Sequence, residues 1–151
     1  MASNKSVQKL LQNILKDNKI EILPIDQAFY KVTKLESAEP IIANTAIEKN
    51  GHFIVFAQIN RNSLLIFDPL ASDLTKYIIE PLAKSFDSVY FNLQQLQDNE
   101  SEFCSIFCAS FAVHLVKKRE ISEYFDLFSR NDLTLNDGYA TDYLFKEIYR
   151  L

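Results

Sequence analysis

Two strand-like runs joined by a short polar turn constrain the fold of this chain more than any other feature. The runs are His52–Ile59 and Leu64–Asp68, and the residues between them read Asn-Arg-Asn-Ser, which is typical of a hairpin turn. A hairpin turn fixes the register of its strands, so a turn centred on Arg61 pairs residues whose numbers sum to about 122. His52 and Asp68 then project from one face as diagonal neighbours, about 7 Å apart at Cβ.

This pair of side chains can do acid–base chemistry. A carboxylate at that range can fix the tautomer of an imidazole and stabilise its protonated form. The hairpin therefore makes His52 a candidate general base and Asp68 a candidate orienting acid. Taken alone, however, a histidine that opens a strand is more often an ordinary exposed residue, and an Asp-Pro pair after a strand usually forms a turn.

A long apolar run supplies a candidate nucleophile. Phe103–Val116 predicts a buried helix, preceded by the polar loop Gln97–Glu102, in which Ser101 is the expected N-cap. Cys104 then falls in the first helical turn, where free N–H groups and the helix dipole lower the pKa of a thiol and can stabilise an oxyanion. Gln97 could add a side-chain amide donor. The alternative is that Cys104 is simply part of the core, as most cysteines in apolar helices are.

The other patterns place further helices and strands around these features. They predict helices over 4–17, 120–129 and 137–150, strands over 41–45 and 89–93, and a short edge strand or extended loop over 20–25. The expected fold class is α+β, with a small mixed or antiparallel sheet packed against the central helix that carries Cys104 at its N-terminus. Because no linker or repeat divides the chain, we expect a single domain over residues 1–151.

Composition argues against several classes of protein. The net charge is −4 and the pI is near 5.2, so nucleic-acid binding is expected to be weak or absent. Cys104 and Cys108 are the two cysteines, which are too few to favour a structural zinc site without several histidines, and the chain has only two. The sequence contains no apolar run of roughly 18 residues, so no membrane span is predicted.

The order and spacing of the candidate residues resemble a known family. Gly51–Ala57 and Leu65–Leu70 resemble the His and acid blocks of the adenain family, the maturation proteases of adenoviruses. Gln97–Cys108 resembles its Gln-to-Cys block, with Gln seven residues before the first Cys, Ser three before it, and a second Cys four after it. The order His, acid, Gln, Cys is also similar to that of ubiquitin-like-protein-specific proteases. Residues 131–149 look like the helical C-terminal part of the short proteases of virophages and Polinton-type elements.

The resemblance implies a papain-like or adenain-like cysteine protease fold and a set of site residues. They are Cys104 as nucleophile, His52 as general base and then acid, Asp68 as the acid that orients His52, and Gln97 as an oxyanion-hole donor beside the main-chain N–H of Cys104. Cys108 matches a family position that has no catalytic role, so we expect it in the helix core. His114 lies too far along the helix to join the site and is expected to be structural.

Three residues depart from the family pattern. Phe53 replaces the usual Trp, so an aromatic plate beside the imidazole is kept without its indole N–H. Asp68 replaces the Glu of adenain and does the same job at shorter reach. Ser105 replaces the usual Gly after the nucleophile, and its side chain narrows the approach of substrate. This departure supports an alternative interpretation, in which the chain is a catalytically inactive relative that acts as a scaffold or binding module.

The resemblance also implies a biological role. It implies a viral cysteine endopeptidase that cleaves capsid or core precursor proteins during virion maturation, after glycine or another small residue, in the virion and the infected cell. Adenain uses a disulfide-linked peptide and DNA as cofactors; this chain has no third cysteine, so we expect either no cofactor or a noncovalent peptide or DNA activator. A monomer is favoured. A protease that removes ubiquitin-like tags is the alternative enzyme.

Overall fold

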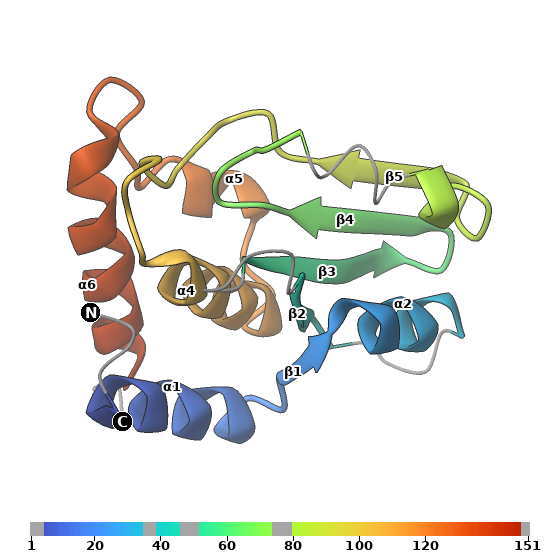
Figure 1. The fold of residues 1–151 in the computed structure, drawn as a ribbon, viewed down its shortest axis with the longest axis horizontal. Helices are drawn as coiled ribbons and strands as arrows, with labels where there is room; N and C mark the ends of the chain where they lie inside the picture. Colours follow the sequence, from blue (N-terminus) through green and yellow to red (C-terminus); the bar gives the residue numbers. More distant parts are fainter. Residues whose placement is uncertain (1–4, 35–38, 46–51, 74–79, 149–151) are drawn as a thin grey trace.

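Five strands form one mixed sheet whose strand order follows the chain, β1-β2-β3-β4-β5 (Figure 1). The computed structural model describes residues 5–34, 39–45, 52–73 and 80–148. Neighbouring strands are parallel at both edges of the sheet (β1 with β2, β4 with β5) and antiparallel in its centre. The strands are β1 (Glu21–Pro24), β2 (Ile41–Asn44), β3 (Phe53–Asn60), β4 (Ser63–Phe67) and β5 (Ser88–Phe91). The predicted α+β class with a small mixed sheet is confirmed.

The central hairpin has the register that its turn predicts. Val55 pairs with Phe67 and Gln58 pairs with Leu64, so the paired numbers sum to 122. The register shifts only beside the turn, between Gln58 and Asn60. Local turn chemistry therefore fixed the alignment of two strands that carry the candidate histidine and acid at their far ends.

Both faces of the sheet are buried, each under different helices. Alternate residues of β3 separate cleanly, because Val55 and Ala57 join one hydrophobic cluster while Ile54 and Phe56 join the other. On the first face, α4 (Cys104–Val116) packs on β2 and β3, and α1 (Lys5–Asp17), α5 (Ile121–Phe125) and α6 (Asn136–Ile148) pack around α4. The second face is covered by α2 (Ile25–Thr33) together with residues 82 and 86. The sheet therefore lies between two packed hydrophobic layers.

The central helix α4 is enclosed on nearly every side. Ten of its 13 residues are buried, and it contacts β2, β3, α1, α5 and α6 (Figure 1). A helix that is apolar all round is stable only in such an enclosure. The predicted buried helix over residues 103–116 is therefore confirmed, with its first helical residue at Cys104.

The predicted N-cap of α4 is wrong. Phe103 occupies the N-cap position and makes no side-chain capping hydrogen bond, whereas Ser101 lies two residues further out. The Ser101 hydroxyl accepts a hydrogen bond from the Phe103 N–H (3.1 Å) and donates to the carboxylate of Asp137 on α6 (2.7 Å). The hydroxyl thus joins the start of α4 to α6, but it does not cap α4, because the helix begins only at Cys104.

One helix was missed, and the other helix predictions differ mainly in their ends. The missed helix is α2, because Pro24 and the alternating residues before it indicated extended backbone. Its buried residues are Ala28 and Val32, one turn apart. The helix predicted over 120–129 is shorter, and a 3-10 turn (Leu133–Leu135) precedes α6. The predicted start of the first helix at residue 4 lies outside the described residues. Within the described part of the chain, no helix combines the length and the apolar character that crossing a bilayer requires.

Candidate active site

The start of β3, the end of β4 and the first turn of α4 meet at one end of the sheet. His52 directly precedes β3, Asp68 directly follows β4, and Cys104 is the first residue of α4. The imidazole of His52 lies between the other two side chains, with Nδ1 3.2 Å from Cys104 Sγ and Nε2 2.7 Å from Asp68 Oδ1. Because a carboxylate only accepts, the proton of the neutral ring lies on Nε2.

The strand ends explain how residues from opposite faces can meet. By alternation, His52 and Asp68 continue the rows of Ile54 and Ile66, which belong to the face that α2 covers. Both residues lie one position beyond their strands, where the sheet no longer separates the two faces. An imidazole placed there can reach the sulfur of Cys104, which belongs to the helix on the other face.

The carboxylate of Asp68 is held by at least four hydrogen bonds. Its Oδ1 accepts from His52 Nε2 and from the N–H of Leu70 (3.0 Å), and its Oδ2 accepts from the N–H (3.0 Å) and hydroxyl (2.6 Å) of Ser72. Burial opposes ionisation, but the hydrogen bond and charge of His52 and the bonds from Ser72 outweigh it and lower the pKa of Asp68 below its usual value. The carboxylate is thus fixed in orientation and stays charged.

Two residues that sequence analysis missed support this aspartate. Asn92, just past β5, accepts a hydrogen bond from the Asp68 N–H (2.9 Å) and donates one to the Asp68 carbonyl (2.7 Å). Ser72 is brought back to the carboxylate by a turn in which Ala71 adopts the left-handed region (φ 48°). The four-residue spacing of Asp68 and Ser72 is a recognisable turn signal. Asn92, in contrast, is brought to Asp68 by the parallel pairing of β4 with β5, which the local sequence does not indicate.

The sulfur of Cys104 lies against the backbone of Phe53 as well as the imidazole. The Phe53 N–H donates to Sγ (3.3 Å), and the thiol lies 3.1 Å from the Phe53 carbonyl oxygen. The pKa of Cys104 is lowered to about 6, most strongly by the thiol of Cys108, and the hydrogen bond and charge of His52 help to outweigh the opposing effect of burial.

The pKa of His52 moves in the opposite direction. Burial disfavours its charged form, but hydrogen bonds to Asp68 and Cys104 and the negative charges on both outweigh it and raise the pKa to about 10. Between about pH 6 and about pH 10, the side chains of Cys104 and His52 therefore form a thiolate–imidazolium pair. A thiolate is the reactive form of cysteine toward carbonyl carbon.

Gln97 lies near the site but is not hydrogen-bonded to its sulfur. Its main-chain N–H donates to the carbonyl of Pro69 (3.0 Å), the residue after Asp68, and its side-chain Nε2 donates to the carbonyl of Ser101 (2.9 Å). The side chain is 2 % exposed, and its Oε1 is buried without a hydrogen-bond partner. The amide Nε2 carries a second N–H, and the role of Gln97 as an oxyanion donor stays a prediction.

The first residue of α6 secures the loop that presents Gln97. Asn136 is fully buried; its Nδ2 donates to the carbonyls of Leu96 (2.8 Å) and Ser129 (2.9 Å), and its Oδ1 accepts from the Ser129 N–H (2.8 Å). One side chain thus joins two loops to the helix behind them, and sequence analysis gave no indication of this role.

Replacing Asn136 by alanine should lower the free energy of unfolding by about 2–4 kcal/mol, because the buried carbonyl of Leu96 and two partly buried main-chain groups of Ser129 would lose their partner. Urea denaturation would measure this as a lower midpoint at unchanged slope. The exposed Asn131 provides the matched control, and Asn131→Ala should change stability by less than about 0.5 kcal/mol. Equal midpoints for the two variants would contradict the bridging role.

The other two candidate residues lie within α4. Cys108 is fully buried, and its thiol lies 3.2 Å from the Phe53 carbonyl. His114 is buried near the C-terminal end of the helix, with Nδ1 2.8 Å from the hydroxyl of Tyr143 and Nε2 2.6 Å from the carbonyl of Glu120. Among the residues that the structure describes, no group of three or more His, Cys, Asp or Glu side chains could hold a metal ion.

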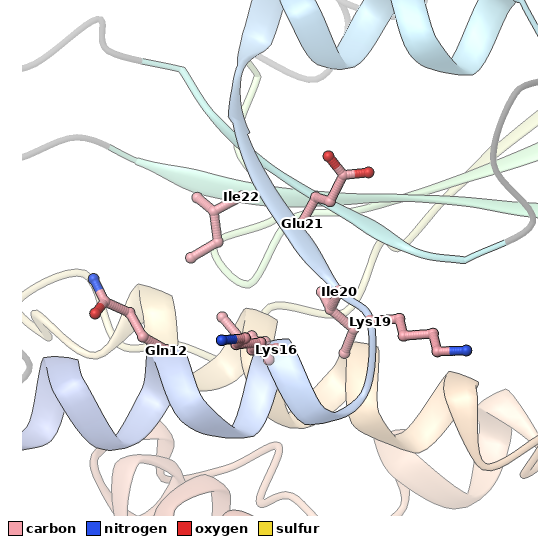
Figure 2. A pocket seen from close by; sticks show the side chains of 7 residues that line it. Gln12, Lys16, Lys19, Ile20, Glu21 and Ile22 are labelled. Atoms are coloured by element: carbon pink, nitrogen blue, oxygen red, sulfur yellow. The ribbon is translucent and has the colours of Figure 1, made fainter.

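A separate hollow lies beside α1, away from the His52 cluster. It has a volume of about 550 Å³ and runs between the C-terminal part of α1 and β1, as Figure 2 shows. The residues that line it include Lys16, Lys19 and Glu21, and the carboxylate of Glu21 also pairs with Lys31 on α2. It includes no residue of the His52 cluster.

Taken together, the cluster has the parts needed for acyl transfer. It holds a sulfur nucleophile, a base within hydrogen-bonding distance of it, and a carboxylate that orients the base. The N–H groups of Cys104 and Ser105 precede the first helical hydrogen bond, in which the Ile106 N–H donates to the Phe103 carbonyl (3.0 Å), so they could serve an oxyanion that forms at Cys104.

Comparison with protein families gives one match. Residues 3–102 match the model of the peptidase C39 family, a segment that includes His52, Asp68 and Gln97 and ends two residues before Cys104. No curated protein matches the chain. Since the matched segment covers well over half of the 151 residues, the chain belongs to the peptidase C39 family of cysteine peptidases.

Proposed function

We propose that the chain is a cysteine endopeptidase that uses Cys104, His52 and Asp68 as its catalytic triad. The observation that carries this proposal is the position of the His52 ring, with one nitrogen 3.2 Å from the sulfur and the other 2.7 Å from the carboxylate. Membership of a cysteine peptidase family supports the class of reaction, and the assignment of Cys104 as nucleophile rests on the geometry, because the matched segment contains neither cysteine.

In this mechanism the Cys104 thiolate attacks the carbonyl carbon of the scissile peptide bond. The oxyanion of the tetrahedral intermediate accepts from the main-chain N–H of Cys104 and from Gln97 Nε2. The imidazolium of His52 then gives its proton to the leaving amine, and an acyl-enzyme thioester remains. Neutral His52 takes a proton from a water molecule, whose oxygen attacks the thioester; the acid product leaves and the thiolate–imidazolium pair is restored.

The pH dependence of cleavage should follow the two ends of this pair. We expect kcat/KM to rise through about pH 6, where Cys104 loses its proton, and to fall through about pH 10, where His52 loses the proton that the leaving amine needs. A fluorogenic peptide assayed across this range would measure both limbs. A single limb near pH 8.5, the value of an ordinary thiol, would show that no ion pair forms.

We further propose that the substrate is a viral capsid or core precursor, cleaved after glycine or another small residue during virion maturation. The adenain-like blocks around His52, Asp68 and Cys104 support this. The site itself also favours a small residue, because Cys104 is only 7 % exposed and the partly buried side chain of Ser105 stands next to it. The protein would then act in the infected cell and in the virion.

Co-expression with the major capsid protein of the same genome tests this proposal. Intact-mass analysis should show one site-specific cut that is absent with Cys104→Ala. Cleavage of a ubiquitin-like tag from a fluorophore, with the capsid precursor left intact, would favour the deconjugating enzyme instead. Equal and slow labelling of Cys104 and Cys108 by a thiol-reactive probe would favour the inactive scaffold.

A further inference from the structure

The main chain of Phe53 faces a gap at the end of the sheet. The Thr45 N–H donates to the His52 carbonyl (2.9 Å), so residues 45 and 52 form a hydrogen-bonded pair. Hydrogen-bonded and non-hydrogen-bonded pairs alternate along an antiparallel ladder, so the next pair, Asn44 with Phe53, is a non-hydrogen-bonded one. The N–H and C=O of Phe53 therefore point away from β2, toward the side on which β4 lies. However, the paired part of β4 ends at Phe67, opposite Val55, and no strand residue reaches Phe53.

Two thiols of α4 fill this gap. The Phe53 N–H donates to Cys104 Sγ (3.3 Å), and the Phe53 carbonyl lies 3.1 Å from Cys104 Sγ and 3.2 Å from Cys108 Sγ. The two cysteines are four residues apart on one helix, which places both on the face that meets the strand end. A single carbonyl oxygen thus lies within hydrogen-bonding distance of both sulfur atoms.

Ionisation of Cys104 changes this arrangement. Once the thiol has lost its proton it can no longer donate, and the carbonyl oxygen of Phe53 would face a negative sulfur at about the same distance. A buried carbonyl left without a donor is costly, and one beside an anion more so. The thiol of Cys108 is the one remaining donor shown at this oxygen, since Cys108 lies 3.2 Å from it.

We propose that Cys108 is a positioning residue for the nucleophile, whose S–H group satisfies the Phe53 carbonyl, or turns to the sulfur itself, when Cys104 becomes a thiolate. This inference rests on the proposed function, because it gives Cys108 a role in preparing the same site. It departs from the expectation that Cys108 merely fills the core. A core role requires only volume, whereas this role requires a hydrogen-bond donor.

The electrostatics of the site agree with this geometry. Burial raises the pKa of Cys108 well above its usual value, and the charges of Cys104 and Asp68 raise it further, so this thiol keeps its proton while Cys104 is ionised. Cys108 is also the largest influence that lowers the pKa of Cys104. The titratable groups that face the pair are His52 and Asp68 at the sheet end and Tyr124 on α5, whose hydroxyl is bonded to Ser110 and to the Phe107 carbonyl.

The test compares Cys108→Ser, which keeps a donor, with Cys108→Ala, which removes it. The rate of alkylation of Cys104 by iodoacetamide, followed by mass spectrometry against pH, reports the apparent pKa of the thiolate. We expect Cys108→Ala to raise that pKa by about one to two pH units. Alkylation would then be at least about tenfold slower on the acid side of the transition and unchanged above it, while Cys108→Ser stays close to the parent protein.

Two outcomes would overturn the inference: equal apparent pKa values for all three proteins, or an upward shift as large in Cys108→Ser as in Cys108→Ala. Thermal unfolding confirms that each variant is folded, and Cys108→Val serves as the apolar variant if alanine leaves the core too loosely packed. Alkylation needs no substrate. Unshifted pKa values with normal cleavage would therefore reject only the role of Cys108, whereas absent cleavage with the expected shift would reject only the proposed function.

Discussion

Replacing Cys104 by alanine should abolish peptide cleavage, with kcat/KM lowered by about 10⁵–10⁶-fold. The reason is that no other described side chain combines a lowered thiol pKa with contact to the imidazole of His52. The second cysteine is fully buried, and its raised pKa keeps it protonated. Rates on a glycine-containing fluorogenic peptide, at enzyme concentrations high enough to detect the residual reaction, would measure the loss.

A matched variant separates loss of the nucleophile from loss of the fold. Cys108→Ser changes the neighbouring thiol on the same helix and should keep cleavage close to that of the parent protein. Adding His52→Ala to Cys104→Ala should cost little more, because groups that act as one unit are strongly non-additive. Cleavage by Cys104→Ala within about tenfold of the parent rate would mean that another residue is the nucleophile.

Replacing Asp68 by asparagine should lower kcat by about 10³–10⁴-fold. The carboxylate accepts from His52 on one oxygen and from Ser72 on the other, and an amide cannot do both. If the amide oxygen keeps His52, its NH₂ group meets the N–H and O–H of Ser72. If the amide is flipped, its NH₂ group faces Nε2 of His52, so the proton of the neutral ring must lie on Nδ1, facing the sulfur of Cys104. In either orientation the imidazolium of His52 loses its negatively charged partner.

The pH profile identifies the cause of that loss. With the charge of Asp68 removed, the pKa of His52 should fall, so the alkaline limb of kcat/KM should move to lower pH than about 10. Asp87→Asn is the control, since Asp87 is exposed and lies at the start of β5, and its effect should be within about twofold. A variant Asp68→Asn that retains the parent rate and profile would remove Asp68 from the triad.

Sequence analysis could place His52 and Asp68 because their relation is local. A short polar turn fixes the register of the hairpin, and the period of two in a strand puts both residues in the same row. These two facts bring the two side chains within reach of each other, which the hydrogen bond between Nε2 and Oδ1 then realises. Cys104 could be placed at a helix start by its apolar run, but its position against His52 depends on how α4 packs on the sheet, which no local pattern encodes.

The residues that were missed or misassigned all depend on contacts between distant segments. Ser101 was expected to cap α4, but its hydroxyl instead joins the start of the helix to Asp137 on α6. Asn92 and Asn136 each bind main-chain groups far away in the sequence, and their own neighbourhoods resemble ordinary loops. The role of the Phe53 backbone was likewise missed. The sequence indicated only an aromatic side chain beside the imidazole, whereas the Phe53 carbonyl contacts the thiols of Cys104 and Cys108.

Direct capture of the acyl-enzyme tests the central claim most closely. The protein would be mixed with a peptide ester ending in glycine, quenched in acid, and analysed by intact mass and peptide mapping. We expect one added acyl group, held as a thioester on Cys104 and absent from both Cys104→Ala and His52→Ala. An acyl group mapped to any other residue, or ester turnover that is unchanged in Cys104→Ala, would contradict the mechanism.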